Sequence, residues 1–136
     1  MRKWMMLLVM AMLLTACSSN HADRTVAMYR KHEALFLEAV QSENYAPVEA
    51  LRYVQEIETW QNPVKVDFYC GGSGLVPSSS YYGILYQPSL DLEGKVESDS
   101  QWMHEGDGYR FIQHEGDNVF YYEPLGNGFY YYEEHY

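Results

Sequence analysis

The sequence predicts a small α+β domain in which one or two N-terminal helices pack on an antiparallel sheet that ends in a C-terminal β-meander. Apolar residues recur at helical spacing between Thr25 and Gln41, and they alternate at strand spacing between Val64 and Cys70. The last third of the chain repeats a turn and an aromatic strand every ten residues. A helical segment followed by a run of strands is typical of α+β domains.

The segment from Thr25 to Gln41 is expected to form one amphipathic helix. With about 100° of rotation per residue, its apolar side chains share one wide arc. They are Val26, Met28, Tyr29, Leu35, Phe36, Leu37, Ala39 and Val40. Asp23 is placed to cap the N-terminus of this helix.

A second helix is expected to open at Pro47 and to extend to about Ile57. Residues 54–60, at the end of this segment, fit a strand as well as a helix, and their periodicity leaves both possibilities open. The dipeptide Asn62-Pro63 then marks a turn, after which strand patterns begin.

The first expected strand follows that turn. Its apolar residues Val64, Val66, Phe68 and Cys70 alternate with polar ones, which predicts that their face of the strand is buried. The glycine-rich run 71–74 is expected to end or bulge this strand.

The middle of the chain contains one more expected strand between two irregular segments. Residues 77–80 are expected to form a loop, and residues 81–87 a second strand that Pro88 stops. Residues 89–100 are polar, which predicts a long surface connection.

The C-terminal third contains a short internal repeat. His104-Glu105-Gly106-Asp107 recurs as His114-Glu115-Gly116-Asp117, and Pro124-Leu125-Gly126-Asn127 is a degenerate third copy. The aromatic segments that follow the three copies are 109–112, 119–122 and 129–132. Gly-Asp and Asn-Gly dipeptides between alternating strands are strong hairpin signals. The repeat therefore predicts a β-meander, with Trp102 just before it.

The N-terminus begins with Arg2 and Lys3 and continues with an uninterrupted apolar run of eleven residues, Trp4 to Leu14. A membrane-spanning helix needs about 20 apolar residues, so this run is too short for a permanent anchor. The run ends in Leu14-Thr15-Ala16-Cys17, and the whole segment resembles the signal peptide and lipobox of bacterial lipoproteins. The alternative is an ordinary signal peptide that is cut after Ala16, with no role for Cys17.

The resemblance to lipoproteins implies an address and an anchor. In that family the cysteine thiol receives a diacylglyceryl group and the chain is cut before it, which would make residues 1–16 a cleaved signal peptide. Residues 17–22 would be a lipidated tether, and residues 23–136 a single small domain. Two acyl chains hold a protein stably on a membrane, so we expect Cys17 to keep the domain on the extracytoplasmic face of the cell membrane. Ser18, rather than an aspartate, follows the cysteine, which would permit transport to an outer membrane in a host that has one.

The chain is acidic. Its formal net charge is −10, from 9 basic and 19 acidic residues, and loss of Arg2 and Lys3 with the signal peptide would bring it to about −12. Residues 97–136 hold nine of the acids and a single base, Arg110. Such a surface repels nucleic acid and anionic lipid headgroups and attracts a basic protein or a cation. Plain solubility on a crowded cell surface would explain the same charge.

Catalytic and metal-binding motifs are weak in this sequence. Cys70 lies on the apolar face of its strand, where a thiol should be buried and unreactive. Gly71 and Ser73 fit the nucleophile pattern Gly-x-Ser-x-Gly, but Leu75 occupies the position of the last glycine. The repeated turns could offer histidine and aspartate ligands to a cation, yet their spacing matches neither a zinc site nor an EF-hand. We expect no catalytic residue, no metal and no cofactor.

Tyrosine is the most distinctive component of the domain, since the chain contains 14 of them. Strand alternation places Tyr131 on the sheet face opposite its two neighbours, and it separates Tyr121 from Tyr122 in the same way. Some of these rings must lie outside the core, and exposed tyrosines favour binding surfaces. Trp102, Tyr121 and Tyr131 are therefore candidates for a binding surface on which outward-facing aromatic residues cluster. The alternative is that tyrosine serves only as a good strand former.

These features predict an exported, lipid-anchored envelope lipoprotein that is a non-catalytic binding module for an envelope or extracellular protein or glycan. One alternative is an acidic inhibitor or immunity-type lipoprotein that acts on a basic secreted enzyme. An enzyme that depends on Cys70 is the weakest alternative. The expected partners are the membrane, through the lipid on Cys17, and a basic protein or a glycan, but no nucleic acid.

Overall fold

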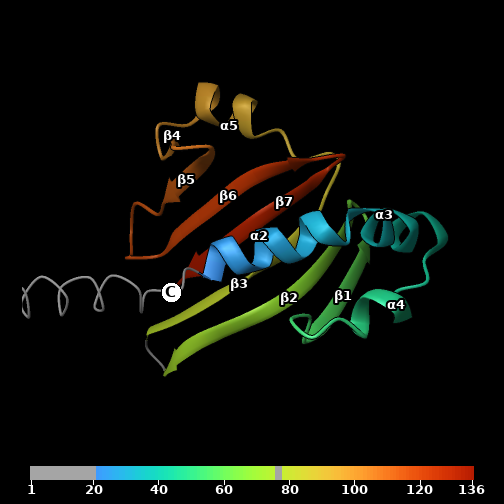
Figure 1. Cartoon of the computed structure of the whole chain (residues 1–136). Helices are drawn as coiled ribbons and strands as arrows, with labels where there is room; N and C mark the ends of the chain where they lie inside the picture. Colours follow the sequence, from blue (N-terminus) through green and yellow to red (C-terminus); the bar gives the residue numbers. More distant parts are fainter. Residues whose placement is uncertain (1–20, 76–77) are drawn as a thin grey trace, which may run out of the picture.

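The computed structural model describes residues 21–75 and 78–136. The expected signal peptide and Cys17 lie outside these residues, as does Pro77 of the expected loop. Within them, four helices accompany one seven-stranded antiparallel sheet (Figure 1). The expected mixed α+β class is confirmed, with more strand than helix.

The helices are α2 (His21–Lys31), α3 (Glu33–Ser42), α4 (Ala46–Glu49) and α5 (Leu92–Ser98). The strands are β1 (Glu56–Gln61), β2 (Val64–Leu75), β3 (Ser78–Tyr86), β4 (Trp102–Glu105), β5 (Gly108–Ile112), β6 (Val119–Gly126) and β7 (Phe129–His135). In space the strands follow the order β1-β2-β3-β7-β6-β5-β4.

Two meanders make up this sheet. Strands β1 to β3 form one and strands β4 to β7 form the other, and antiparallel pairing of β3 with β7 joins them. Between β3 and β4 the chain crosses from the middle of the sheet to its far edge, and α5 lies in this crossing. The expected C-terminal meander is confirmed, and it begins one strand earlier than expected because Trp102 opens β4.

The turns of the C-terminal meander explain the sequence repeat. Gly126 pairs with Phe129, so Asn127 and Gly128 alone form the β6–β7 turn. Both have positive φ, 54° and 80°, as the hairpin turns that match the twist of antiparallel strands require. In the first copy of the repeat, Gly106 has φ 56° at the β4–β5 turn. The glycines of the second and third copies, Gly116 and Gly126, also have positive φ, 139° and 98°.

The expected single helix over Thr25–Gln41 is wrong, because the chain breaks at His32 between α2 and α3. His32 has φ −118° and ψ 20°, outside the helical region. Side-chain periodicity continues across the break because both helices present apolar residues to the same core. Asp23 is not an N-cap, since α2 already includes His21, and the last two residues of the expected tether are therefore helical.

Residues 46–61 form a short helix and an edge strand. Pro47 lies in the first turn of α4, as expected, but α4 ends at Glu49. Of residues 54–60, for which helix and strand were both left open, Val54 and Gln55 are irregular and the rest is strand, because β1 pairs with β2 from Glu56 and Tyr69 to Gln61 and Val64. Pairing with β2 makes this segment a strand, and local periodicity cannot reveal such a partner.

Two further segments expected to be irregular are ordered. The expected loop 77–80 is wrong from Ser78 onward, because β3 starts there and its Ser80 pairs with His135 of β7. The expected surface connection 89–100 contains α5, whose N-terminus is capped by Asp91. The Asp91 carboxylate accepts a hydrogen bond of 2.9 Å from the Gly94 N–H.

Aromatic rings from α2, α3 and the sheet share one core. The ring centroid of Tyr29 lies 5.2 Å from that of Phe129, and the centroid of Phe36 lies 4.9 Å from that of Phe68. The predicted buried face of β2 is confirmed at Val66, Phe68 and Cys70, whereas Val64 at the strand end is 46% exposed. In Figure 1, α2 crosses the sheet, and it contacts β3 and β7.

Candidate functional site: a groove on the sheet

The candidate site lies on the sheet face that points away from this core. Phe68 and Tyr131 point into the core, so their strand neighbours Asp67 and Tyr132 point to the other face. There they line an open groove with two adjoining depressions of about 170 and 330 Å³, which share Asp67, Tyr132 and Glu134. We call this the sheet groove.

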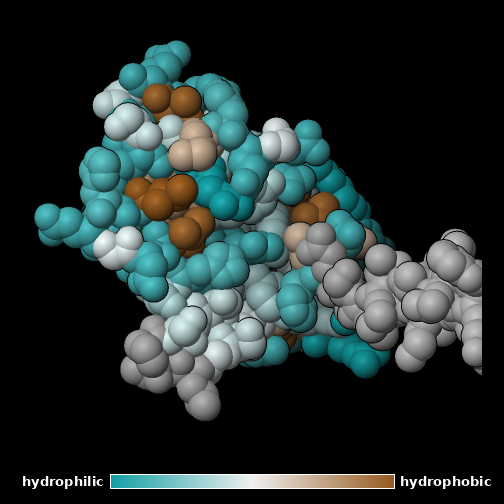
Figure 2. All heavy atoms as spheres, turned by 90° about the vertical axis from the view of Figure 1, so that its left-hand side faces the viewer, coloured by the Kyte–Doolittle hydropathy of each residue, from teal (hydrophilic) through white to brown (hydrophobic). Residues whose placement is uncertain are grey.

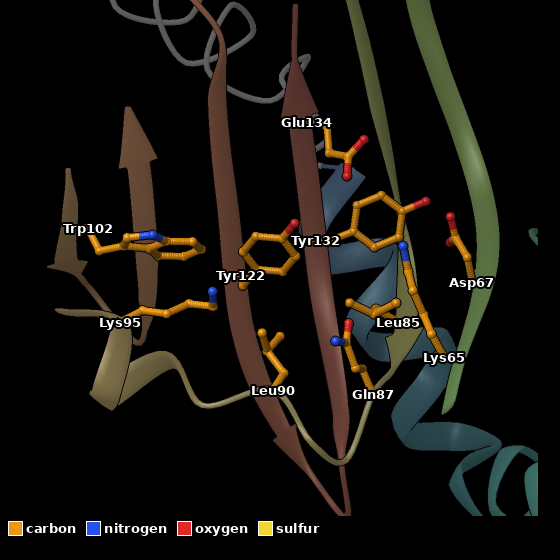
Figure 3. Close-up of a pocket in the computed structure, with 10 residues that line it drawn as sticks. All are labelled: Lys65, Asp67, Leu85, Gln87, Leu90, Lys95, Trp102, Tyr122, Tyr132 and Glu134. Atoms are coloured by element: carbon orange, nitrogen blue, oxygen red, sulfur yellow. The ribbon is translucent and has the colours of Figure 1, made fainter. Parts of the chain in front are cut away.

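The smaller depression, drawn in Figure 3, is the aromatic half of the sheet groove. Besides the shared residues, it is lined by Lys65, Leu85, Gln87, Leu90, Lys95, Trp102 and Tyr122. The larger depression is the acidic half, with Glu56, Glu58, Tyr69 and Tyr81. Strands β1, β2, β3, β4, β6 and β7 contribute residues, and the crossing with α5 closes one side.

Three rings form a row in the aromatic half. In Figure 3, Trp102, Tyr122 and Tyr132 lie one after another across β4, β6 and β7. The centroids of Trp102 and Tyr122 are 6.0 Å apart, with an interplanar angle of 29°, and Tyr122 pairs directly with Tyr132 in the β6–β7 register. Trp102 and Tyr122 offer flat apolar area edged by indole N–H and hydroxyl groups, whereas Tyr132 is only 4% exposed.

Trp102 and Tyr122 of this row also belong to a longer chain of aromatic contacts on the same face. Neighbouring ring centroids lie between 5.1 and 6.1 Å apart along it. Its members, in order of contact, are Tyr69, Tyr81, Tyr136, Phe120, Phe111, Trp102 and Tyr122. The aromatic residues of this face are thus clustered rather than scattered.

Two lysines lie over tryptophan rings on this face. The Lys65 Nζ is 4.5 Å from the ring centroid of Trp60, and the Lys95 Nζ is 5.3 Å from that of Trp102. Attraction between an ammonium group and the ring face fixes both lysines beside the groove. Within the described residues neither lysine forms an ion pair, so each can still bind a polar or anionic group.

Asp67 is a largely buried carboxyl at the boundary between the two halves. Burial raises the pKa of Asp67 to about 6, although a hydrogen bond from Tyr132 and the nearby Lys65 lower it. In the described part of the chain, its Oδ1 is buried and has no hydrogen-bond partner. Burial and the neighbouring Asp67 raise the pKa of the Tyr132 hydroxyl far above its usual value, so this hydroxyl stays protonated and donates.

The acidic half combines carboxylates with tyrosine rings. Glu56 and Glu58 of β1 face it from one side, and Glu134 of β7 from the other. Tyr69 and Tyr81 stand between them, with centroids 6.1 Å apart. Its lining contains no basic side chain, so it favours a positively charged ligand group.

The sequence-predicted surface residues separate onto both faces. Trp102 lies in the sheet groove. Tyr121 lies on the core side, where its hydroxyl is 3.4 Å from Glu123 and its ring packs against the core. Tyr131 is 0% exposed and its hydroxyl donates to Glu133 at 2.7 Å, so its prediction as a surface residue is wrong. The sequence correctly predicted that Tyr131 and Tyr132 lie on opposite faces of the sheet. It was wrong in placing Tyr131 on the face that points away from the core.

Sequence reasoning missed Tyr122, Tyr132 and Asp67. Tyr122 and Tyr132 directly follow the two proposed surface tyrosines, and Asp67 directly precedes Phe68 of the predicted core. The detectable signal was Asp67, a polar residue between Val66 and Phe68, because it marks the second face of a strand whose first face is apolar.

Cys70 lies on the core face, as expected, and is 5% exposed. Its thiol donates to the Phe68 carbonyl at 3.3 Å, and burial raises the pKa of Cys70 to about 12. The thiolate, which is the nucleophilic form, is therefore scarce at neutral pH.

The repeated His-Glu-Gly-Asp turns do not converge. His104 lies 3.5 Å from Glu93 of α5, whereas the second copy lies in the exposed β5–β6 connection. Within residues 21–75 and 78–136, no group of three or more His, Cys, Asp or Glu side chains is placed to hold a metal ion.

On the side of the molecule that carries β4 and β5, the exposed apolar residues form only small groups (Figure 2). Figure 2 views the side that carries β4 and β5 and shows a few apolar side chains within a mostly hydrophilic surface. Met103 and Ile112 are the large exposed apolar residues of these two strands. Groups of this size are ordinary on a protein surface.

None of the described helices combines the length and the apolar character that a membrane crossing requires. Comparisons with protein-family models, with curated proteins and with solved structures give no match to this chain.

Proposed function

We propose that this chain is an exported lipoprotein, anchored through Cys17 on the extracytoplasmic face of a membrane, whose sheet groove binds part of an envelope or extracellular protein or glycan without catalysis. The observation that carries the binding role is the continuous chain of aromatic contacts around the groove. Aromatic residues gathered over a concave surface are typical of binding sites.

The proposal takes α2 and α3 as the cover of the opposite sheet face. Tyr29 and Phe36 contact Phe129 and Phe68 on that side, and these contacts bury the aromatic residues there. The sheet groove on the other face is then open to a ligand, except at the edge where α5 lies.

The chemistry of the aromatic half fits an extended chain with flat apolar faces and polar edges, such as a sugar chain or a polypeptide segment. Trp102 and Tyr122 supply the stacking area, and Gln87, Lys95 and Asp67 supply polar groups around it. Polar groups at the rim of an apolar groove fix the orientation of such a ligand.

Tryptophan fluorescence tests the groove directly. A Trp60→Phe background leaves Trp102 as the one tryptophan after residue 16, and soluble peptidoglycan fragments and envelope protein extracts serve as probes. We expect saturable changes in Trp102 emission. Titration calorimetry, which needs no tryptophan, then compares the variants, and we expect Trp102→Ala to lose about 2 kcal/mol of binding free energy, the size of an interface hot spot. Tyr53→Ala, at an exposed tyrosine outside the groove, is the matched control. Unchanged affinity of Trp102→Ala would remove the groove from the proposal.

The anchor has a separate test. Cys17→Ser removes the thiol that the lipid would modify, so we expect the protein to lose incorporated fatty acid and to leave the membrane fraction. Labelling of cells with a fatty-acid analogue and fractionation measure both effects. Fatty acid that persists in the variant would contradict lipidation at Cys17.

A second candidate function is inhibition of a basic secreted enzyme, and the acidic half of the groove favours it. Glu56, Glu58 and Glu134 around Tyr69 and Tyr81 suit a lysine or arginine side chain. Binding would then weaken steeply with salt and in Glu56→Gln/Glu58→Gln. Association with cationic secreted hydrolases that is independent of salt would count against this function.

A further inference from the structure

A basic pocket lies between α2 and the turn that follows α4, and it shares no lining residue with the sheet groove. Its volume is about 420 Å³, and its lining consists of Arg24, Ala27, Met28, Lys31, His32, Leu51, Arg52 and Tyr53. Three of these residues are arginine or lysine and none is acidic. In a chain with a net charge of −10, the pocket is a local concentration of positive charge.

Helical spacing builds one wall of this pocket. Arg24, Ala27, Met28 and Lys31 lie three or four residues apart and therefore share one stripe of α2. Arg52 stands on the other side, with its guanidinium carbon 5.8 Å from the ring centroid of Tyr53. The two walls come from segments that are separate in the sequence.

The positive charges of the pocket are not neutralised within the described residues. The ion pairs there involve Arg30, Arg110 and two histidines, but none of Arg24, Lys31 and Arg52. These three side chains can therefore meet an external anion.

The floor of the pocket is apolar. Met28 belongs to the core, Leu51 is half-buried against it, and Tyr53 is 43% exposed at the rim. Basic side chains around an aliphatic floor, with an exposed tyrosine, are the combination that proteins present to the headgroup region of a membrane.

We propose that this pocket docks on the membrane surface by binding the phosphates of anionic phospholipid headgroups. The expected anchor brings the pocket within reach of that surface, and this step rests on the proposed function. Four residues from Cys17 to His21 span at most about 14 Å, and Arg24 lies less than one helical turn farther along α2. The expected repulsion between anionic lipid and the acidic residues 97–136 favours the same orientation, which leaves the sheet groove for its ligand.

Lysine footprinting tests the docking. The full-length protein, purified from its host membrane, is reconstituted in phosphatidylcholine vesicles with or without phosphatidylglycerol and treated with an amine-acetylating reagent. Lys31 reports on the pocket, and Lys65 and Lys95 beside the groove are internal references. We expect acetylation of Lys31 to slow about fivefold or more on the anionic vesicles, the effect of one basic residue at such a surface. Salt at about 1 M should reverse the protection, and the references should not change.

Matched variants separate the pocket from overall charge. Arg24→Gln/Arg52→Gln and Gln41→Glu/Gln61→Glu each make the protein more negative by two charges, at exposed positions inside and outside the pocket. We expect the first pair to abolish the protection of Lys31 and the second to retain at least half of it. Equal melting temperatures verify that both variants are folded.

Two results would overturn the docking. One is equal acetylation of Lys31 on neutral and anionic vesicles. The other is protection by inorganic phosphate on neutral vesicles, which would assign the pocket to a soluble anion. The mass of the N-terminal peptide from the same samples tests the anchor independently. Acylated Cys17 with unprotected Lys31 rejects the pocket alone, and protected Lys31 with unacylated Cys17 rejects the anchor alone.

Discussion

The two faces of the sheet use neighbouring residues for different purposes. On the core side, Phe68 and Tyr131 have no exposed surface and contribute to a core shared with α2 and α3. One residue along each strand, Asp67 and Tyr132 line the sheet groove instead. Because a strand turns successive side chains to opposite faces, one short segment can serve stability and recognition at the same time.

The two faces also differ in the surroundings of a buried polar atom that has no hydrogen-bond partner. Among the described residues, two buried side-chain oxygens have no hydrogen-bond partner, the Tyr29 hydroxyl in the core and Asp67 Oδ1 at the groove. The first belongs to a ring that packs against Phe36 and Phe129, whereas the second borders an open depression. The unpaired hydroxyl costs the core some desolvation free energy, whereas the unpaired carboxyl oxygen at the groove lies beside a depression that a ligand group could enter.

The largest expected effect comes from the core side. Phe36→Ala removes a ring that contacts Tyr29, Phe68 and Phe129, so we expect the free energy of unfolding to fall by about 3–5 kcal/mol. Urea denaturation measures it. Tyr53→Ala, at an exposed ring, should change stability by less than about 0.5 kcal/mol. Comparable losses in the two variants would break the distinction between core and surface rings.

The next effect concerns the groove and depends on pH. The pKa of Asp67 is about 6 in the folded chain and about 3.9 in an unfolded one, so the folded state binds its proton more tightly. Its contribution to stability is full below pH 4 and is lost as the pH rises through 6, by about 3 kcal/mol. Asp67→Asn should remove this loss, as urea denaturation between pH 4 and pH 7 would reveal, whereas Glu58→Gln should retain it. Parallel pH profiles of wild type and Asp67→Asn would contradict the burial of this carboxyl.

The smallest effect compares two buried tyrosine hydroxyls. Tyr29→Phe removes a hydroxyl without a partner and should leave stability unchanged or raise it by about 1 kcal/mol. Tyr131→Phe removes a hydroxyl that donates to Glu133 and should lower stability by about 1–2 kcal/mol. Thermal unfolding of the two variants side by side measures both. A larger loss of stability in Tyr29→Phe than in Tyr131→Phe would contradict these hydrogen-bond assignments.

The sequence predicted those parts of the fold that local chemistry controls. Asn127 and Gly128 specify their own turn, and the alternation from Val66 to Cys70 specifies a strand with one buried face. It did not predict the break at His32 or the strand nature of residues 56–61, because a core shared by two helices and pairing with β2 impose them. Tertiary contacts override local pattern at such points.

The site was predicted in part for the same reason. Trp102, which was proposed for a binding surface, lines the sheet groove, and alternation separated Tyr131 from Tyr132. Alternation divides a strand into two sets of side chains, but it does not say which set the helices face. Tyr131 was therefore proposed for the surface, whereas its neighbour Tyr132 lines the groove.

By itself, the sequence determined the meander, its turns, the division of each strand into two faces and the acidity of the chain, because these follow from neighbouring residues and from composition. Only the tertiary structure decided which face is covered, and it brought Asp67, Trp102 and Tyr132 to one groove and Arg24 and Arg52 to one pocket. These groups come from distant segments, so their proximity depends on strand order and helix placement, which no local pattern encodes.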